Sequence, residues 1–288
     1  CSAAVATVGI IVHHERDQAT ELARDAAAWL RERGHEVRLP LHDAAIARLT
    51  DVGTAEVDFA RGLDVAVSLG GDGTMLRTVD LVAAEDVPVI GVNVGQLGYL
   101  TEVEPAGMRL ALKRFLAGSY DDEERMLLAV TVEAAGFEGN VHLALNEAVL
   151  EKTPMGHTVR LGVSVDGETF TPYAADGLIV ATPTGSTAYA FSARGPIVEP
   201  THRCLLMTPV SPHMLFDRSL VLPPTATVRI EVLDDRAATL SVDGSNLGTL
   251  RPGDAVRATG ARESARFVTF GPRDFLHILK TKFGLSDR

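Results

Sequence analysis

The sequence predicts two domains, an α/β domain followed by a domain made mainly of β-strands. In the first part of the chain, short apolar segments alternate with stretches whose apolar residues recur at helical spacing. From about residue 126 onward, short strands separated by turn signals replace that alternation. The chain has 288 residues, 46% of them apolar, which is enough for two ordinary hydrophobic cores.

Strands and helices alternate through the first domain, which therefore predicts a parallel sheet. The expected strands cover residues 5–12, 35–39, 63–69 and 87–92. A helix with apolar residues from Ala19 to Leu30 ends before Gly34, and a second helix over 105–116 has proline in its first turn and Gly118 after its end.

The second domain shows the two-residue alternation of half-buried strands, most clearly over 158–165 and 227–232. Asp166-Gly167 and Asp243-Gly244 are its strongest hairpin signals. We expect one helix within it, over 186–193, and an amphipathic packing helix over 274–283 at the end of the chain.

Composition argues against several classes of protein. The formal charge of −11, from 27 Lys and Arg against 38 Asp and Glu, disfavours nucleic-acid binding through a basic face. No run reaches the roughly 18 apolar residues of a spanning helix, so we expect no membrane segment. Cys1 and Cys204 are too few for a disulfide framework and fit a reducing compartment. We therefore expect a cytoplasmic protein.

The most informative motif follows the strand over 63–69 and reads Gly70-Gly71-Asp72-Gly73-Thr74. Its glycines permit positive φ and let backbone amides approach phosphate oxygens. Asp72 has two interpretations. It is either a turn residue that caps a helix starting near Thr74, or a general base or metal-associated carboxylate beside a bound polyphosphate.

Two further segments combine polar residues with buried strands. Asn146-Glu147 lies within an apolar strand. Either both residues bind a ligand, or Glu147 lies on the solvent face and Asn146 at a strand end or bulge. The segment from Asp176 to Tyr189 runs through a buried strand into a Thr-Gly-Ser-Thr helix entry, which suits either a nucleotide or plain capping.

Three residues follow the first strand, where a doubly wound sheet binds ligands at its carboxyl edge. They are His13, His14 and Arg16. They either belong to a ligand site at this edge or are ordinary solvated loop residues. The histidines of the chain lack metal-ligand spacing. Neither a Walker A pattern nor a Gly-x-Gly-x-x-Gly helix entry is present, which disfavours a P-loop kinase and an ordinary dinucleotide fold.

Together, these motifs resemble those of the NAD kinase family. The glycine loop, Asn146-Glu147 and the Asp176 to Tyr189 segment occur in the order and approximate spacing of that family. Residues 91–100, Gly195-Pro196 and 209–213 extend the resemblance over nearly the whole chain. Phosphofructokinases and the diacylglycerol and sphingoid-base kinases share the glycine motif, but the Asp176 to Tyr189 segment resembles NAD kinases and not the lipid kinases.

The resemblance implies a Rossmann-like α/β domain over 1–125 and a β-rich, sandwich-like NAD-binding domain over 126–265. The segment over 266–288 would return to pack its helix on the first domain, and the nucleotide site would lie between the domains. The implied reaction is phosphorylation of the 2′-hydroxyl of the adenosine ribose of NAD to give NADP. ATP or inorganic polyphosphate would be the donor, with Mg²⁺ or another divalent metal, and the protein would be a homodimer or homotetramer.

The resemblance also implies roles for individual residues. Asp72 would match the general base that takes the 2′-hydroxyl proton. The phosphate loop would comprise Gly70, Gly71, Gly73 and Thr74, and the positions that bind NAD would be Asn146, Glu147, Asp176, Thr187, Ala188, Tyr189 and Ser192. Arg194 and Ala175 depart from the residues that many members have there, which affects the expected ligand contacts and not the expected activity.

Two other functions compete with this one. A kinase for another alcohol, a lipid or a sugar, would share the glycine loop, but a lipid substrate predicts a basic amphipathic stretch that the sequence lacks. A non-catalytic NADP-binding sensor would be expected to lack the carboxylate base, whereas Asp72 is present.

Overall fold

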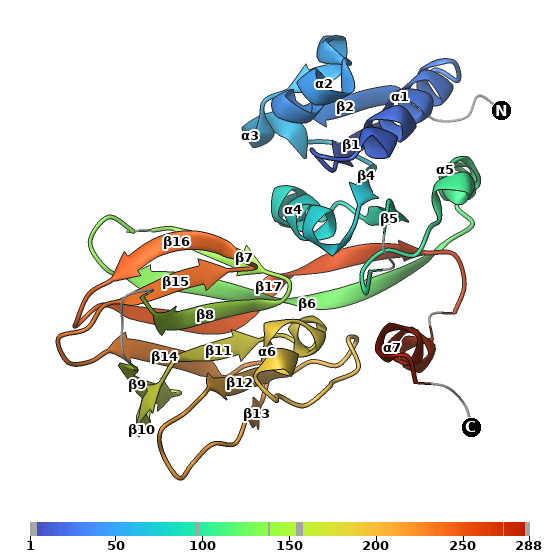
Figure 1. Cartoon of the computed structure of the whole chain (residues 1–288). Coiled ribbons are helices and arrows are strands. Elements are labelled where there is room, and N and C mark those ends of the chain that lie inside the picture. Colours follow the sequence, from blue (N-terminus) through green and yellow to red (C-terminus); the bar gives the residue numbers. More distant parts are fainter. Residues whose placement is uncertain (1–4, 96–97, 138, 154–157, 273, 286–288) are drawn as a thin grey trace. The chain divides into compact units, whose positions relative to one another are not determined.

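The computed structural model describes residues 5–95, 98–137, 139–153, 158–272 and 274–285, and the chain forms two compact units (Figure 1). Unit 1 comprises Cys1–Glu124 and Ala265–Arg288, and unit 2 comprises Arg125–Ser264. Cys1 lies outside the described residues, and Cys204 is a half-buried free thiol. Within the described ranges, no helix is long and apolar enough to span a membrane.

Unit 1 is an α/β unit with a parallel sheet in the order β3-β2-β1-β4-β5. The strands are β1 (Thr7–Val12), β2 (Glu36–Pro40), β3 (Gly53–Thr54), β4 (Val65–Gly70) and β5 (Val89–Asn93), and the end of β17 (Ala255–Thr269) pairs with β5. The helices are α1 (Asp17–Arg31), α2 (Leu41–Ala47), α3 (Glu56–Phe59), α4 (Asp72–Val82), α5 (Met108–Leu116) and α7 (Phe275–Phe283), with 3-10 turns η1 (Thr50–Val52), η2 (Ala83–Glu85) and η3 (Pro105–Gly107). This strand order is that of the predicted Rossmann-like sheet.

The apolar strands of unit 1 form its core because the sheet is covered on both faces. All residues of β4 and β5 are buried, and the apolar face of α1, with Ala19, Ala23 and Leu30, packs on the same cluster. The predicted helix over 105–116 begins with the 3-10 turn η3, and Gly118 after its end has a positive φ of 68°.

The parallel register places the ends of three strands next to one another. Val12 pairs with Leu69, and Gly70 pairs with Asn93. Beyond the strands, the His13 backbone N–H donates to the Leu69 carbonyl and the Val94 N–H donates to the Gly70 carbonyl, both within 2.9 Å. The segments after β1, β4 and β5 therefore meet at the carboxyl edge of the sheet, where open α/β sheets bind ligands.

Unit 2 is the predicted β-rich unit and contains two antiparallel sheet regions. One has the order β10-β9-β14-β17, with β6 pairing β17 and β7, and the other has the order β13-β12-β11-β8-β15-β16. The strands are β6 (Asp121–Glu133), β7 (Val141–Ala144), β8 (Glu147–Lys152), β9 (Val159–Val165), β10 (Glu168–Ala175), β11 (Gly177–Ala181), β12 (Leu205–Val210), β13 (Leu220–Leu222), β14 (Thr227–Val232), β15 (Ala238–Val242) and β16 (Ser245–Leu250).

Alternate residues of these strands bury a common core, as the two-residue periodicity predicts. Leu161 and Ile230 from one sheet and Leu150 and Val180 from the other belong to one hydrophobic cluster, so the sandwich-like arrangement is confirmed. Both predicted hairpin turns are present, at Asp166-Gly167 and Asp243-Gly244, and all four turn residues have positive φ.

The helix predicted over 186–193 is wrong in form. The structure has a 3-10 turn, η4 (Thr184–Thr187), followed by the short helix α6 (Tyr189–Ser192), and the backbone of Ala188 between them is not helical. Hydroxyl groups explain the difference, because Thr187 donates to the Thr184 carbonyl and Ser186 bonds to Val198. The Thr187 bond competes locally with a regular helix, and the Ser186 bonds tie this segment to a residue 12 positions along the chain.

The C-terminal helix is confirmed as a packing element of the first unit. In α7, Leu279 is buried, and the Lys282 ammonium lies 4.7 Å from the centre of the Tyr99 ring. Asp274 caps the helix by accepting the His277 backbone N–H at 2.9 Å.

Candidate active site

The glycine loop joins β4 to α4 at the carboxyl edge of the unit 1 sheet. Gly71 is the N-cap residue of α4, and the helix begins at Asp72, two residues earlier than the sequence predicts. Among the described residues, no side chain caps this helix end. The first backbone N–H groups of α4 are therefore available to an anion, which the helix dipole also favours.

None of the three loop glycines, Gly70, Gly71 and Gly73, has the positive φ that the sequence led us to expect. They matter because they lack a side chain. A Cβ on Gly70 would overlap the Thr74 hydroxyl, so this glycine permits close packing inside the loop. A Cβ on Gly71 or Gly73 would have no described neighbour within 4 Å, so these two glycines border open space.

Asp72 does not cap its own helix, so that interpretation of the sequence is wrong. Its Oδ2 accepts the backbone N–H of Tyr99 and its Oδ1 accepts that of Leu100, both at 3.0 Å. A Cβ on Gly98 would overlap Oδ1, which shows how closely this segment packs on the carboxylate. Asp72 is half-buried and fixed in orientation, and it keeps lone pairs beyond those two bonds.

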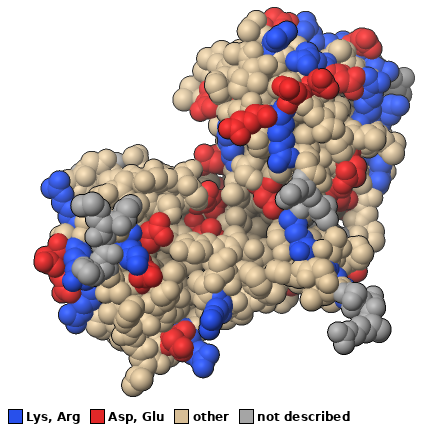
Figure 2. All heavy atoms as spheres, viewed as in Figure 1, with Lys and Arg blue, Asp and Glu red and all other residues tan. Residues whose placement is uncertain are grey.

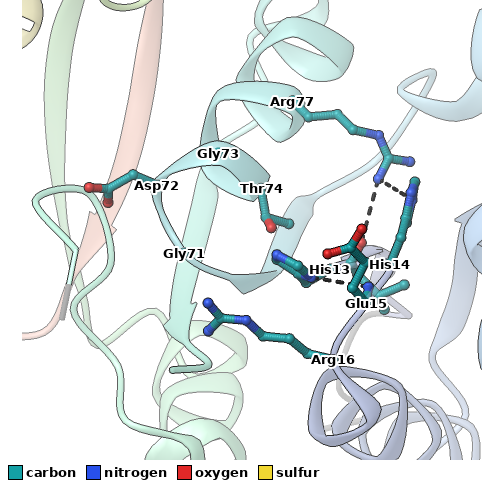
Figure 3. Close-up of a pocket in the computed structure, with 10 residues that line it drawn as sticks. His13, His14, Glu15, Arg16, Gly71, Asp72, Gly73, Thr74 and Arg77 are labelled. Atoms are coloured by element: carbon teal, nitrogen blue, oxygen red, sulfur yellow. Dashed lines mark hydrogen bonds between the residues drawn. The ribbon is translucent and has the colours of Figure 1, made fainter. Parts of the chain in front are cut away.

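A pocket of about 470 Å³ opens beside the loop (Figure 3). Its lining comes from the end of β1, the segment that follows it, and the start of α4: Val12, His13, His14, Glu15, Arg16, Gly71, Asp72, Gly73, Thr74 and Arg77. In Figure 3, the Asp72 side chain points away from His13, His14 and Arg77. The carboxylate and the cationic wall therefore lie on different sides of the loop.

The positive charge on this wall comes from Arg16 and Arg77, and Glu15 adds one negative charge. Partial burial, followed by the positive charge of Arg16, lowers the pKa of His13, which favours its neutral form. The Arg16 guanidinium lies where a Cβ of Gly95 would lie, so Gly95 makes room for it. His13, His14 and Arg16, which the sequence left open between loop and ligand residues, line the pocket with the glycine loop.

A second polar site lies in unit 2, where β8 begins at Asn146-Glu147. The carboxylate of Asp243, in the β15–β16 turn, accepts the backbone N–H groups of Leu145, Asn146 and Glu147 at 2.7, 2.8 and 3.0 Å. The residue that follows β11 also holds this corner, because the Thr182 N–H donates to the Asn146 carbonyl at 2.9 Å. Asp243 was expected only as a turn residue, and it is the residue that shapes this corner.

Glu147 is buried, so the interpretation that placed it on the solvent face is wrong. Burial, followed by the negative charge of Asp243, raises the pKa of Glu147 to about 8, while a hydrogen bond from the Tyr189 backbone acts in the opposite direction. Its Oε2 atom has no hydrogen-bond partner among the described residues. Glu147 is therefore protonated at neutral pH and has a polar atom that a ligand could satisfy.

Replacing Glu147 by glutamine is expected to stabilise the protein above pH 5. The unfolded chain ionises Glu147 near pH 4.5, whereas the folded protein keeps the proton up to about pH 8. Because the folded state binds more protons over this interval, the free energy of unfolding falls as the pH rises through it. Denaturant unfolding should show a gap between Glu147→Gln and wild type that grows by roughly 2–4 kcal/mol from pH 5 to pH 8.5.

The exposed Glu168 provides the control for this experiment. Glu168→Gln should change the free energy of unfolding little at any of these pH values. A gap between Glu147→Gln and wild type that stays constant from pH 5 to pH 8.5 would contradict the raised pKa.

The Thr-Gly-Ser-Thr segment lies against the Asn146 corner. A Cβ on Gly185 would overlap the Asn146 carbonyl oxygen, so only glycine allows this approach. Thr182 ties the segment down, since its hydroxyl donates to the Leu145 carbonyl at 2.5 Å and accepts the Gly185 N–H at 3.2 Å.

The residues after this segment place Tyr189 beside several carboxylates. Tyr189 and Ser192 are exposed, and Thr187 and Ala188 are half-buried. Burial and the charges of Glu151, Asp176 and Glu147 raise the pKa of Tyr189. Carboxylates are acceptors for ribose hydroxyls, so this face suits the sugar and amide groups of a dinucleotide.

Asp176 is at the other end of β11 from the Asn146 corner. Its neighbour Gly177 pairs with Glu151, whereas Ala181 at the far end of the strand pairs with Glu147. Asp176 forms an ion pair with Lys152, with 2.7 Å between Oδ1 and Nζ. The structure therefore brings the loop residues 70–74 together in unit 1 and Asn146, Glu147 and residues 187–189 together in unit 2. Asp176 lies at the other end of β11, and its charge reaches the second group at Tyr189.

A parallel α/β sheet with a Gly-Gly-Asp-Gly loop at its carboxyl edge, in a chain that also has a β-sandwich unit, is typical of a nucleotide-binding protein. The ATP-NAD kinase N-terminal domain matches residues 8–120, and the ATP-NAD kinase C-terminal domain matches residues 145–270. The chain belongs to the NAD kinase family.

Individual relatives agree with this assignment over nearly their whole length. The NAD kinase of Heliobacterium modesticaldum is 42% identical over 96% of this chain and 98% of its own, and NAD kinase 1 of Streptomyces coelicolor is 37% identical over 97% and 86%.

Solved structures also match. A yeast NADH kinase in complex with NADH has a TM-score of 0.89 at 26% identity, over 99% of this chain and 89% of its own. An NAD kinase from Archaeoglobus fulgidus in complex with ATP has a TM-score of 0.73 at 24% identity, over 97% of this chain and 98% of its own. At that identity, the match shows that the two proteins share a fold.

Proposed function

We propose that this chain is an NAD kinase that transfers the terminal phosphoryl group of ATP to the 2′-hydroxyl of the adenosine ribose of NAD, giving NADP and ADP. Membership of a family described as ATP-NAD kinase supports the reaction and the donor. The observation that carries the mechanism is the Asp72 carboxylate, held by two backbone N–H groups at the start of α4 and bordered by open glycine positions.

Asp72 acts as the general base in this proposal. The 2′-hydroxyl oxygen forms a bond to the transferred phosphorus, the bond from that phosphorus to the leaving ADP oxygen breaks, and the hydroxyl proton passes to Asp72. A positioned base of this kind contributes about 10²–10⁴-fold. The N–H groups at the start of α4 stabilise the negative charge of the phosphates, which is where most of the remaining rate enhancement arises in phosphoryl transfer.

The unit 2 residues bind NAD in this proposal. Asn146 and the protonated Glu147 offer an amide and a carboxylic O–H, which pair with donors and acceptors of the dinucleotide. Thr187, Ala188, Tyr189 and Ser192 lie on the segment beside them, and Asp176 contributes through the carboxylate face around Tyr189. The unpartnered Oε2 of Glu147 supports this assignment.

Mg²⁺ is part of the proposal as a companion of the donor. Among the described residues, no three or more His, Cys, Asp or Glu side chains are grouped as a metal site. This fits Mg²⁺, which proteins bind through one or two carboxylates together with substrate phosphates and waters. The metal would neutralise phosphate charge at the loop.

The location and assembly of the protein also belong to the proposal. A cytoplasmic enzyme fits the free thiol of Cys204. A homo-oligomer, dimer or tetramer, is part of the proposal. Figure 2 shows acidic and basic side chains mixed on the face in view, which agrees with a small anionic ligand as partner and not nucleic acid.

NADP formation by the purified protein tests the proposed reaction. NAD and Mg²⁺ are supplied with ATP, with inorganic polyphosphate or with no donor, and NADP is expected only where a donor is present. A folded protein that forms no NADP with either donor, but phosphorylates a lipid or a sugar, would replace the proposal with a kinase for another alcohol. NADP binding without turnover of any substrate would replace it with a sensor.

A further inference from the structure

Asp43, on α2, is a buried carboxylate to which the sequence assigns no role. Its side chain has no exposed surface. Oδ2 accepts the backbone N–H of Val12 at 2.9 Å, while Oδ1 lies 2.5 Å from Nη2 of Arg77 and 3.0 Å from Nε2 of His14. All three partners line the pocket beside the glycine loop.

Stability accounts for the bond from Asp43 to the buried Val12 N–H, but not for its ion pair with Arg77. A buried ion pair is often replaced by apolar side chains of similar volume without loss of stability, because desolvation offsets the attraction. The rest of this helix face is apolar, with Ala44 and Ala47 buried beside Asp43. What Asp43 supplies is orientation, since it fixes the end of β1 and the direction of the Arg77 side chain.

Arg77 has donors to spare for a ligand. Nη2 points to Asp43, while Nη1 lies 2.8 Å from Nε2 of His14. That His14 nitrogen can donate to Asp43 or accept from Arg77, but it has one site and cannot do both. Nη1 also donates to the Val12 carbonyl at 3.5 Å, so the donors of Arg77 that have no partner among the described residues are Nε–H and the second Nη2–H, and 28% of the side chain is exposed. A planar guanidinium oriented in this way suits the oxygens of a phosphate.

We propose that Asp43 is a positioning residue that holds the Arg77 guanidinium at the pocket wall, where Arg77 binds the phosphates of the phosphoryl donor. The proposal rests on the proposed function for the identity of the donor. Arg16 approaches the same pocket from the segment after β1, so a polyphosphate there would meet guanidinium groups from two separate elements.

The test uses four variants of the full chain: Arg77→Gln, Arg77→Lys, Asp43→Asn and the double variant Asp43→Asn/Arg77→Gln. For each, KM for ATP, KM for NAD and kcat are measured, together with the affinity for inorganic tripolyphosphate by calorimetry. Arg109 and Asp25 form an exposed ion pair in the same unit and do not line the pocket, so Arg109→Gln and Asp25→Asn are the matched controls.

Arg77→Gln is expected to raise KM for ATP and weaken tripolyphosphate binding about 10- to 100-fold, the loss of one charge-assisted hydrogen bond, while KM for NAD changes less than about 3-fold. Arg77→Lys should lie between wild type and Arg77→Gln. Asp43→Asn should shift the same constants in the same direction, and the double variant should be no worse than Arg77→Gln within about 2-fold, because Asp43 acts through Arg77. The controls should match wild type.

Three results would overturn the proposal. The first is an unchanged KM for ATP and tripolyphosphate affinity in Arg77→Gln, which decides the matter even if Asp43→Asn does not fold. The second is an equal rise in the two KM values in Asp43→Asn. The third is a full additional loss in the double variant. Tripolyphosphate binding requires no NAD phosphorylation, so it distinguishes a failure of this proposal from a failure of the proposed reaction.

Discussion

Asp72→Asn is expected to lower kcat for NADP formation about 100- to 10,000-fold, with NAD still bound. Asparagine keeps the volume of the side chain but cannot take the 2′-hydroxyl proton. It also has a single acceptor oxygen, so either the Tyr99 or the Leu100 backbone N–H loses its partner. A lost bond of this kind costs about 1–3 kcal/mol, so a lower Tm is part of the expectation.

Separate measurements keep chemistry apart from folding in this variant. Single-turnover rates report the chemical step, while the dissociation constant for NAD and the unfolding transition report binding and stability. Asp80→Asn changes the same type of group on the exposed side of α4 and should leave turnover unchanged. A kcat of Asp72→Asn within about 3-fold of wild type would show that another group accepts the proton.

Local patterns in the sequence predict most of the fold because the physical causes of these elements are local. Residues 63–69 read as a buried strand because both faces of the sheet are covered, and β4 covers Val65–Gly70. The two Asp-Gly turns adopt the positive φ that their hairpins need. The exception is the helix over 186–193. There, the competing hydrogen bonds of Ser186 and Thr187 decide the backbone, and one of them reaches 12 residues along the chain.

The contacts that complete the candidate site join residues far apart in the chain, and local patterns do not contain them. Asp72 is bound by residues 27 and 28 positions away, and Glu147 by the turn residue Asp243, 96 positions away. The sequence therefore shows that Asp72 has a special role but not that it faces Tyr99 instead of its own helix.

Asp43 had a local signal that sequence reasoning missed. It shares a helix face with Ala47, at the i, i+4 spacing of the buried side, and a charged residue there is unusual. Its partners Val12 and Arg77 lie 31 and 34 positions away, so its role becomes visible only in the folded chain.

Gly71→Val is the variant that tests the phosphate loop, and it is expected to lower kcat/KM for ATP by about 100-fold or more while the fold is kept. Gly71 has extended backbone, with φ −113° and ψ −160°, which valine adopts readily. A Cβ there meets no described atom within 4 Å, so the new side chain would occupy the open space at the start of α4. It would thereby exclude phosphate oxygens from the backbone N–H groups, a loss equivalent to about 3 kcal/mol or more.

Gly70→Ala is the contrasting variant, because it is expected to destabilise the fold and not to block phosphate binding. Its Cβ would overlap the Thr74 hydroxyl, so this smaller substitution is expected to lower Tm by several degrees, as overpacking of a buried site does. The two variants should therefore separate, with Gly71→Val stable and defective toward ATP, and Gly70→Ala unstable. Unchanged ATP kinetics in Gly71→Val would place the donor phosphates elsewhere, whereas a drop in Tm in that variant would show that Gly71 serves packing as Gly70 does.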